Sequence, residues 1–137
     1  RDIRAYDLAA DGSLANERIH INFYPGRSGD GMCIDAEGNL YVAAGLHATR
    51  DTSETLDTRP GIHVISPGGE LLAFQETPVD TITNCTFGGL NNKELYISTA
   101  RKGMSKKEVN KFPLSGSLFK VTTNIKGKKT KSFKALI

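Results

Sequence analysis

A chain of 137 residues with 38% hydrophobic and 24% charged residues has the composition of one globular domain, which excludes a disordered or collagen-like protein. No stretch approaches about 18 consecutive apolar residues, so the sequence predicts no membrane span and no membrane partner. The net charge of +3 conceals a division, because residues 101–137 hold eleven Lys or Arg and one acid, whereas residues 1–100 are net acidic. We interpret the lysines of 126–134 as edge-hairpin residues rather than a nucleic-acid surface, because no aromatic residues alternate with them.

Short strands separated by tight turns recur along the chain, and fourteen glycines favour this pattern over helices. Similar strands are predicted at 3–8, 62–67 and 118–123. Each is followed by a turn and a further strand, at 18–23, 71–75 and 132–136. Two strand pairs precede the later units, 32–35 with 40–42 and 85–87 with 95–97. The chain is therefore an internal repeat of strand pairs.

The repeated unit is four short antiparallel strands, which is the blade of a β-propeller. We predict an all-β propeller domain in which this chain forms about two and a half blades, at 1–24, 30–76 and 83–136. The two later blades contain inserted loops, at 45–60 and 101–116. Because a closed propeller needs at least about four blades, we expect the remainder of the propeller to lie outside this chain. A sandwich of short strands is the competing architecture.

The first candidate for chemistry is Asp30, which precedes a predicted buried strand and lies between Gly29 and Gly31. Neither neighbour has a side chain, so the carboxylate can come close to a ligand. The alternative interpretation is a turn aspartate, because Asp11-Gly12 uses the same dipeptide in a predicted turn. The dipeptide alone does not decide between these interpretations.

Four further residues are candidates for substrate binding, because the predicted topology brings them to the same face as Asp30. His47 and Arg50 lie in the first inserted loop, and Arg101 begins the second. A cationic side chain on this face could attract an anionic ligand. Asn84 precedes the next innermost strand, where its amide could bind a substrate or its own backbone. Simple solvation is the alternative for each loop residue.

The two cysteines, Cys33 and Cys85, lie inside apolar strand patterns and lack the spacing of a disulfide scaffold or a zinc site. We interpret both as small buried hydrophobic residues. His20 and His63 also lie in strand patterns and are interpreted as packing or surface residues. The compartment stays open, with a soluble cytoplasmic or periplasmic protein expected.

Three ordered segments carry a family resemblance: Asp-Gly-Met-Cys-Ile-Asp-Ala-Glu-Gly-Asn-Leu-Tyr-Val-Ala at 30–43, Thr-Asn-Cys-Thr-Phe-Gly-Gly at 83–89 and Leu-Tyr-Ile at 95–97. Together they resemble the C-terminal half of the SMP-30/gluconolactonase family, and the resemblance extends over nearly the whole chain. It implies a six-bladed propeller with one divalent cation in its central channel. It also implies hydrolysis of sugar lactones or, in some relatives, of organophosphate esters.

For the site, the resemblance implies that Asp30 binds the metal and acts as general base. The other usual ligands, a glutamate and an asparagine from earlier blades, are not in this chain. Ca²⁺ is the expected cation, with Mg²⁺, Mn²⁺ and Zn²⁺ as alternatives. Such a cation polarises the ester carbonyl and lowers the pKa of a bound water. Sugar-lactone hydrolysis is therefore the expected function of the whole protein, and we expect this chain alone to be inactive. An organophosphate-ester hydrolase and a non-catalytic binding propeller are the alternatives.

Overall fold

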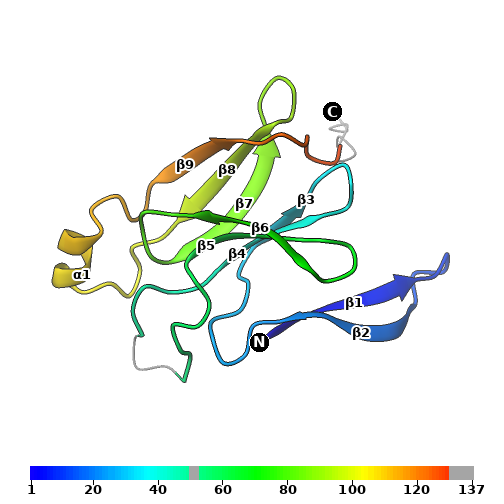
Figure 1. The fold of residues 1–137 in the computed structure, drawn as a ribbon, viewed down its shortest axis with the longest axis horizontal. Coiled ribbons are helices and arrows are strands. Elements are labelled where there is room, and N and C mark those ends of the chain that lie inside the picture. Colours follow the sequence, from blue (N-terminus) through cyan, green and yellow to red (C-terminus); the bar gives the residue numbers. More distant parts are fainter. Residues whose placement is uncertain (50–52, 130–137) are drawn as a thin grey trace, which may run out of the picture.

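The structure, a computed structural model, describes residues 1–49 and 53–129, and Figure 1 shows its antiparallel sheets following one another along the chain. The first sheet pairs β1 (Asp2–Leu8) with β2 (Leu14–Asn22). The second sheet contains β3 (Met32–Ile34), β4 (Leu40–Ala44), β5 (Gly61–Ile65) and β6 (Leu71–Glu76) in chain order. The third contains β7 (Ile82–Gly88), β8 (Glu94–Thr99) and β9 (Leu118–Thr122). The strand predicted at 132–136 lies outside the described residues.

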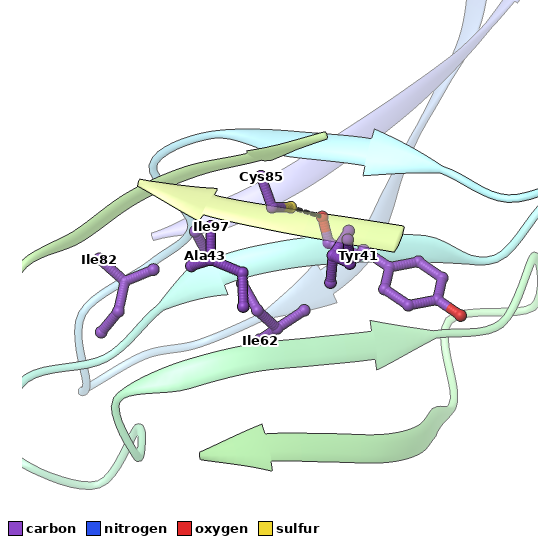
Figure 2. Packing of buried hydrophobic residues seen from close by; sticks show 7 residues of the cluster. Tyr41, Ala43, Ile62, Ile82, Cys85 and Ile97 are labelled. Carbon is purple, nitrogen blue, oxygen red and sulfur yellow. Dashed lines mark hydrogen bonds between the residues drawn. The ribbon is translucent and has the colours of Figure 1, made fainter. Parts of the chain in front are cut away.

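The two central strands of the second sheet, β4 and β5, are buried on both faces, and this explains why such short strands are stable. The cluster between the second and third sheets consists of Tyr41, Ala43, Ile62, Ile82, Cys85, Leu95 and Ile97 (Figure 2). Along β4, Tyr41 and Ala43 belong to this cluster, whereas Val42 and Ala44 belong to a second cluster that includes Phe23. This alternation is the period of two expected of a strand. Each fully buried Ile or Leu side chain in these clusters contributes about 1.5–3 kcal/mol to the free energy of unfolding.

The turn between β3 and β4 is built around Asp35. The Asp35 side chain is fully buried. It accepts hydrogen bonds from the backbone of Glu37 and Asn39, both at 2.9 Å, and from Asn39 Nδ2 at 2.8 Å. A carboxylate that closes its own turn satisfies backbone donors that burial would otherwise leave unpaired. The turn therefore fixes the register of β3 against β4.

The inserted loop at 101–116 contains a helix that the sequence analysis did not predict, α1 (Lys106–Lys111). Ser105 caps it, since the Ser105 side chain accepts from the Glu108 backbone and the Glu108 side chain accepts from the Ser105 backbone. This capping box is a local signal in the sequence Ser-Lys-Lys-Glu. In the part of the chain that the structure covers, no helix has the length and apolar character to cross a membrane.

The chain after β9 crosses to the second sheet, and this corrects the predicted edge hairpin of lysines for its described part. The Lys126 carbonyl accepts from the Ala36 backbone at 2.9 Å, and the Lys128 backbone donates to the Ile34 carbonyl at 3.0 Å. Gly127 is buried, and a Cβ there would lie 2.2 Å from the Cβ of Phe87. A backbone that must pass this close to a neighbouring sheet requires glycine. The segment thus connects the third sheet to the end of β3.

Candidate functional site

Asp30 lies at the point where the second and third sheets meet. Its backbone N–H donates to the Ala43 carbonyl at 2.8 Å, and the Gly31 carbonyl accepts from the Ala43 N–H at 3.0 Å. The Gly31 N–H donates to the carbonyl of Thr83 on β7 at 2.7 Å, across the line of contact between the second and third sheets, which we call the seam. The backbone of Asp30 is therefore held from both sides, while its side chain is 48% exposed. A fixed backbone with an open carboxylate is suited to binding a cation or accepting a proton.

Asn84 lies against the same strand beginning. A Cβ on Gly31 would fall 2.2 Å from the Cγ of Asn84, so only glycine leaves room for that amide. The Asn84 Oδ1 accepts from the Cys85 backbone at 2.8 Å, which is the backbone bond named above as one alternative. Its Nδ2 has no hydrogen-bond partner among the residues described. The structure thus brings Asn84 next to the residue after Asp30, with one donor group available.

Arg27 is a neighbour of Asp30 that the sequence analysis missed. Its guanidinium Nη2 lies 3.8 Å from Asp30 Oδ2, and the Arg27 side chain is 29% exposed. An ion pair this open to water stabilises the fold only slightly, so its effect is mainly on the local potential. The only sequence signal was the three-residue spacing within a loop.

His47 connects the two inserted loops. Its backbone N–H donates to Asp80 Oδ1 at 3.2 Å, and its ring stacks on Phe112 of the second loop with centroids 5.1 Å apart. Asp80 is fully buried and also accepts from the Thr81 backbone at 2.8 Å. The His47 Nε2 is buried, with no hydrogen-bond partner among the described residues. His47 therefore packs one loop against the other, and no contact of its ring with Asp30 is present in the described part of the chain.

Arg101 binds its own loop. Its Nε donates to the Ser115 carbonyl at 2.5 Å, and its Nη2 donates to the Pro113 carbonyl at 2.8 Å. These bonds tie the two ends of the second inserted loop together. Arg50, the remaining candidate, lies outside the described residues. Of the predicted substrate-binding residues within 1–49 and 53–129, Asn84 is the one that lies in the immediate surroundings of Asp30.

The inserted loops leave the second and third sheets at the end where β3 begins (Figure 1). Ala43, the hydrogen-bond partner of Asp30, is one residue from the end of β4, where the first loop begins. The Ala100 N–H donates to the Thr81 carbonyl at 3.0 Å, so the second loop begins beside the start of β7. Both loops thus start from strand ends that adjoin the seam.

The histidines predicted to serve packing lie away from these groups. His63 is buried between the rings of Phe23 and Phe74, at 5.8 and 4.9 Å, and its Nε2 is 2.9 Å from the Arg59 carbonyl. Burial lowers the pKa of His63 below its ordinary value. The packing interpretation is therefore confirmed for His63. His20 is half-buried, with an Nε2 that finds no hydrogen-bond partner in the described ranges.

Asp30 provides the kind of oxygen ligand that a hard cation prefers, but the described residues provide too few ligands for a complete site. The Asp30 carboxylate is an oxygen ligand open to solvent, as Ca²⁺ and Mg²⁺ prefer. Within residues 1–49 and 53–129, however, no group of three or more His, Cys, Asp or Glu side chains could hold a metal ion. A cation at Asp30 would consequently need further ligands from outside this set, as the resemblance implied.

Comparison with known proteins places this geometry in a family. The family model for the SMP-30/gluconolactonase/LRE-like region matches residues 1–101. Human regucalcin is 39% identical over 120 residues, which are 85% of this chain and 36% of regucalcin. Chicken regucalcin (Gallus gallus) is 34% identical with the same coverage. The chain thus spans 36% of the length of these relatives.

Solved structures show the same relationship. A luciferin-regenerating enzyme is 30% identical with a TM-score of 0.70, and the match covers 93% of this chain and 40% of that enzyme. Regucalcin from Agrobacterium tumefaciens, a calcium-binding protein, has a TM-score of 0.74 at 21% identity with the same coverage, which shows the fold alone. The propeller prediction is confirmed, since the chain matches about 40% of six-bladed propeller structures. The chain belongs to the SMP-30/gluconolactonase/LRE-like family.

Proposed function

We propose that the protein containing this chain hydrolyses a sugar lactone with the help of one divalent cation, and that Asp30 is both a ligand of that cation and the general base. Membership of the family supports the reaction class. The A. tumefaciens relative is a calcium-binding protein, which supports Ca²⁺ over the alternatives. Because this chain spans only part of its relatives, the remaining ligands would come from the rest of the protein.

The observation that carries the proposal is the setting of Asp30. Its backbone is hydrogen-bonded to Ala43 within the sheet, while Gly31 is bonded to Thr83 across the seam. Its carboxylate nevertheless stays 48% exposed between two glycines. A rigid backbone costs little reorganisation when a ligand binds, and missing neighbouring side chains allow close approach.

Three residues of this chain would take part. When bound, the cation would polarise the lactone carbonyl and lower the pKa of a water molecule. Asp30 would hold the cation and accept the proton of the attacking water, a contribution of about 10²–10⁴-fold for general base catalysis. The Nδ2 of Asn84 would donate to an oxygen of the substrate. Arg27, 3.8 Å from Asp30, would moderate the negative charge there.

The test is Asp30→Asn in the full-length protein, with Asp11→Asn as matched control. Both residues precede a glycine, but Asp11 is exposed and bonds only within its turn, to the backbone and hydroxyl of Ser13. We expect Asp30→Asn to lower kcat/KM for lactone hydrolysis by about 10²–10⁴-fold. Calcium affinity, measured by calorimetry, should fall with it. Asp11→Asn should change neither quantity.

Other outcomes separate the competing functions. Unchanged hydrolysis and calcium binding in Asp30→Asn would remove Asp30 from the site and overturn the proposal. Calcium binding that depends on Asp30 without turnover of any lactone would identify a non-catalytic binding propeller. Turnover of an organophosphate ester but of no lactone would keep the site and change the substrate class.

A further inference from the structure

The two cysteines of this chain face each other across the seam between sheets. Cys33 lies on β3 and Cys85 on β7, 52 residues further along the chain. Their Sγ atoms are 3.6 Å apart, and both thiols are free. The sequence analysis interpreted each as a separate buried hydrophobic residue, since nothing in their spacing indicates contact. Two thiols at this distance are close enough to form a disulfide when an oxidant removes two electrons.

The environments of the two thiols differ in a way that assigns them different roles. Cys85 is 4% exposed, and its S–H donates to the Tyr41 carbonyl at 3.1 Å, as the dashed line in Figure 2 shows. Cys33 is only half-buried. The contact with Cys85 lowers the pKa of Cys33, whereas the contact with Cys33, together with burial, raises the pKa of Cys85. Cys33 is therefore the more nucleophilic thiol.

Cys33 is the thiol that can be approached from solvent. An open pocket runs along β3 and β7, and Cys33 and Cys85 line it together with Met32, Asn84 and Thr86. The exposed neighbours Asn84 and Thr86 make this wall partly polar. A small polar oxidant can therefore reach Cys33, which is the condition for selective oxidation of a thiol.

We propose that Cys33 and Cys85 form a peroxide-reactive dithiol that closes into a disulfide between the second and third sheets. The Cys33 thiolate attacks one oxygen of hydrogen peroxide, the O–O bond breaks, and the departing hydroxide takes a proton to become water. The Cys33 sulfur is now a sulfenic acid. The Cys85 sulfur attacks it, the S–O bond breaks, and a second water leaves with the Cys85 proton. In sum, two thiols and one peroxide give one disulfide and two waters.

The geometry requires only a small movement. An S–S bond of about 2.05 Å brings the sulfurs closer by about 1.5 Å, which rotation of two cysteine side chains can supply. The bond would join β3 to β7 next to Asn84 and three residues after Asp30. It would constrain the unfolded chain over the 52 residues that separate the cysteines, so the oxidised protein should unfold at a higher temperature.

The experiment treats the full-length protein with a small molar excess of hydrogen peroxide and maps its peptides without reduction. Trypsin separates the cysteines, because it cleaves after Arg50 and leaves peptides 28–50 and 51–93. We expect these two peptides to be joined, with the loss of two hydrogens, and to separate again after dithiothreitol. The melting temperature of the oxidised protein should rise by several degrees and return after reduction.

Variants assign the roles. Cys85→Ser should leave Cys33 as a sulfenic acid that dimedone traps, whereas Cys33→Ser should leave Cys85 unmodified at the same peroxide dose. Peptides that stay separate in the wild-type protein while Cys33 is oxidised to the sulfinic acid would overturn the proposal. The proposal would also be overturned if peptide 28–50 or peptide 51–93 were joined instead to a peptide that carries a different cysteine. The wild-type peptide map decides the matter even where a serine variant fails to fold.

Discussion

The hairpins β1–β2 and β3–β4 are both antiparallel strand pairs closed by a turn with an aspartate and a glycine, but they are stabilised differently. In β1–β2 the strands have 7 and 9 residues, most of which are exposed. Ion pairs cross this hairpin, with Arg4 Nη1 2.5 Å from Glu17 Oε1 and Arg18 Nη1 2.9 Å from Asp7 Oδ1. In β3–β4 the strands have only 3 and 5 residues, and most of β4 is buried. Strand length and burial therefore vary in opposite directions here.

The difference teaches where a functional carboxylate can be placed. Asp11 is exposed, and its carboxylate accepts from the backbone and hydroxyl of Ser13 within its own turn, so its position depends on local bonds. Asp30 lies two residues before the short strand β3, and its backbone position is determined by its bond to Ala43 of β4 and by the bond of Gly31 to Thr83 of the third sheet. Neighbouring sheets, rather than the dipeptide, provide the rigidity that a site needs. The following predictions test this contrast.

The largest effect is expected from removing the buried turn aspartate. Asp35→Ala leaves the backbone donors of Glu37 and Asn39 and the Asn39 amide without their acceptor, inside the protein. We expect the free energy of unfolding to fall by about 3 kcal/mol, since each unpaired buried group costs about 1–3 kcal/mol. Asp11→Ala should leave the urea midpoint unchanged within error. Equal midpoints for both variants would contradict the contrast between the two turns.

The glycines after the two aspartates should also respond differently. Gly31→Ala places a Cβ 2.2 Å from the Asn84 side chain, which must move, and we expect a loss of about 1–3 kcal/mol from overpacking. Gly12 has φ of +87° and open space around it, so Gly12→Ala should cost only about 1 kcal/mol from backbone strain. Urea unfolding measures both. If Asn84 binds substrate as proposed, Gly31→Ala alone should also raise KM.

His63 makes the stability of the buried sheet dependent on pH. Its pKa is lowered by burial, so below the ordinary value of about 6.5 the unfolded chain binds a proton that the folded state resists. The contribution to stability is therefore present above that pH and is lost as the pH falls. We expect the melting temperature to drop by several degrees from about pH 7.5 to about pH 5.5. His63→Phe keeps a ring between Phe23 and Phe74 and should reduce this dependence; an unchanged slope would exclude His63 as its source.

The smallest effect should come from the exposed ion pair beside the site. Arg27→Gln removes a positive charge 3.8 Å from the Asp30 carboxylate that the proposed cation shares. We expect calcium binding to tighten by no more than about fivefold, since exposed pairs contribute about 0–1 kcal/mol. The effect should shrink as salt is added. Weaker calcium binding in this variant would mean that Arg27 supports the site in some other way.

Much of the fold could be predicted from the sequence because the strands carry a period of two. Met32 and Ile34, or Leu40 and Val42, alternate with the side chains of the opposite face. The helix α1 was missed although Ser105 and Glu108 form a capping box, because a six-residue helix has no apolar periodicity. The crossing of residues 126–128 to β3 could not be predicted, since Ala36 and Ile34, the partners of Lys126 and Lys128, are distant in sequence.

The candidate site was predictable only in part, and for a physical reason. Asp30 was found because glycines flank it and an apolar strand follows. The prediction that this strand is buried was wrong in part, since Met32 is exposed and Cys33 and Ile34 are only half-buried. The ion pair with Arg27 and the contact of the two thiols depend on side-chain positions that no spacing specifies. Arg101 was expected on the same face as Asp30, where its charge could bind a ligand. Its guanidinium instead donates to the Ser115 and Pro113 carbonyls. A sequence shows which residues are charged, but it does not show which hydrogen bonds their side chains form.

The crossing of residues 126–128 to the end of β3 has a consequence for synthesis of the protein. The Ala36 N–H and the Ile34 carbonyl receive their partners from Lys126 and Lys128. At a translation rate of about 5–20 residues per second, those partners are made on the order of 5–20 s after the hairpin that they complete. During that interval the nascent β3–β4 hairpin exposes an unfinished edge. A ribosome that stalls before Lys126 would therefore hold the strand that follows Asp30 in an incomplete and association-prone state.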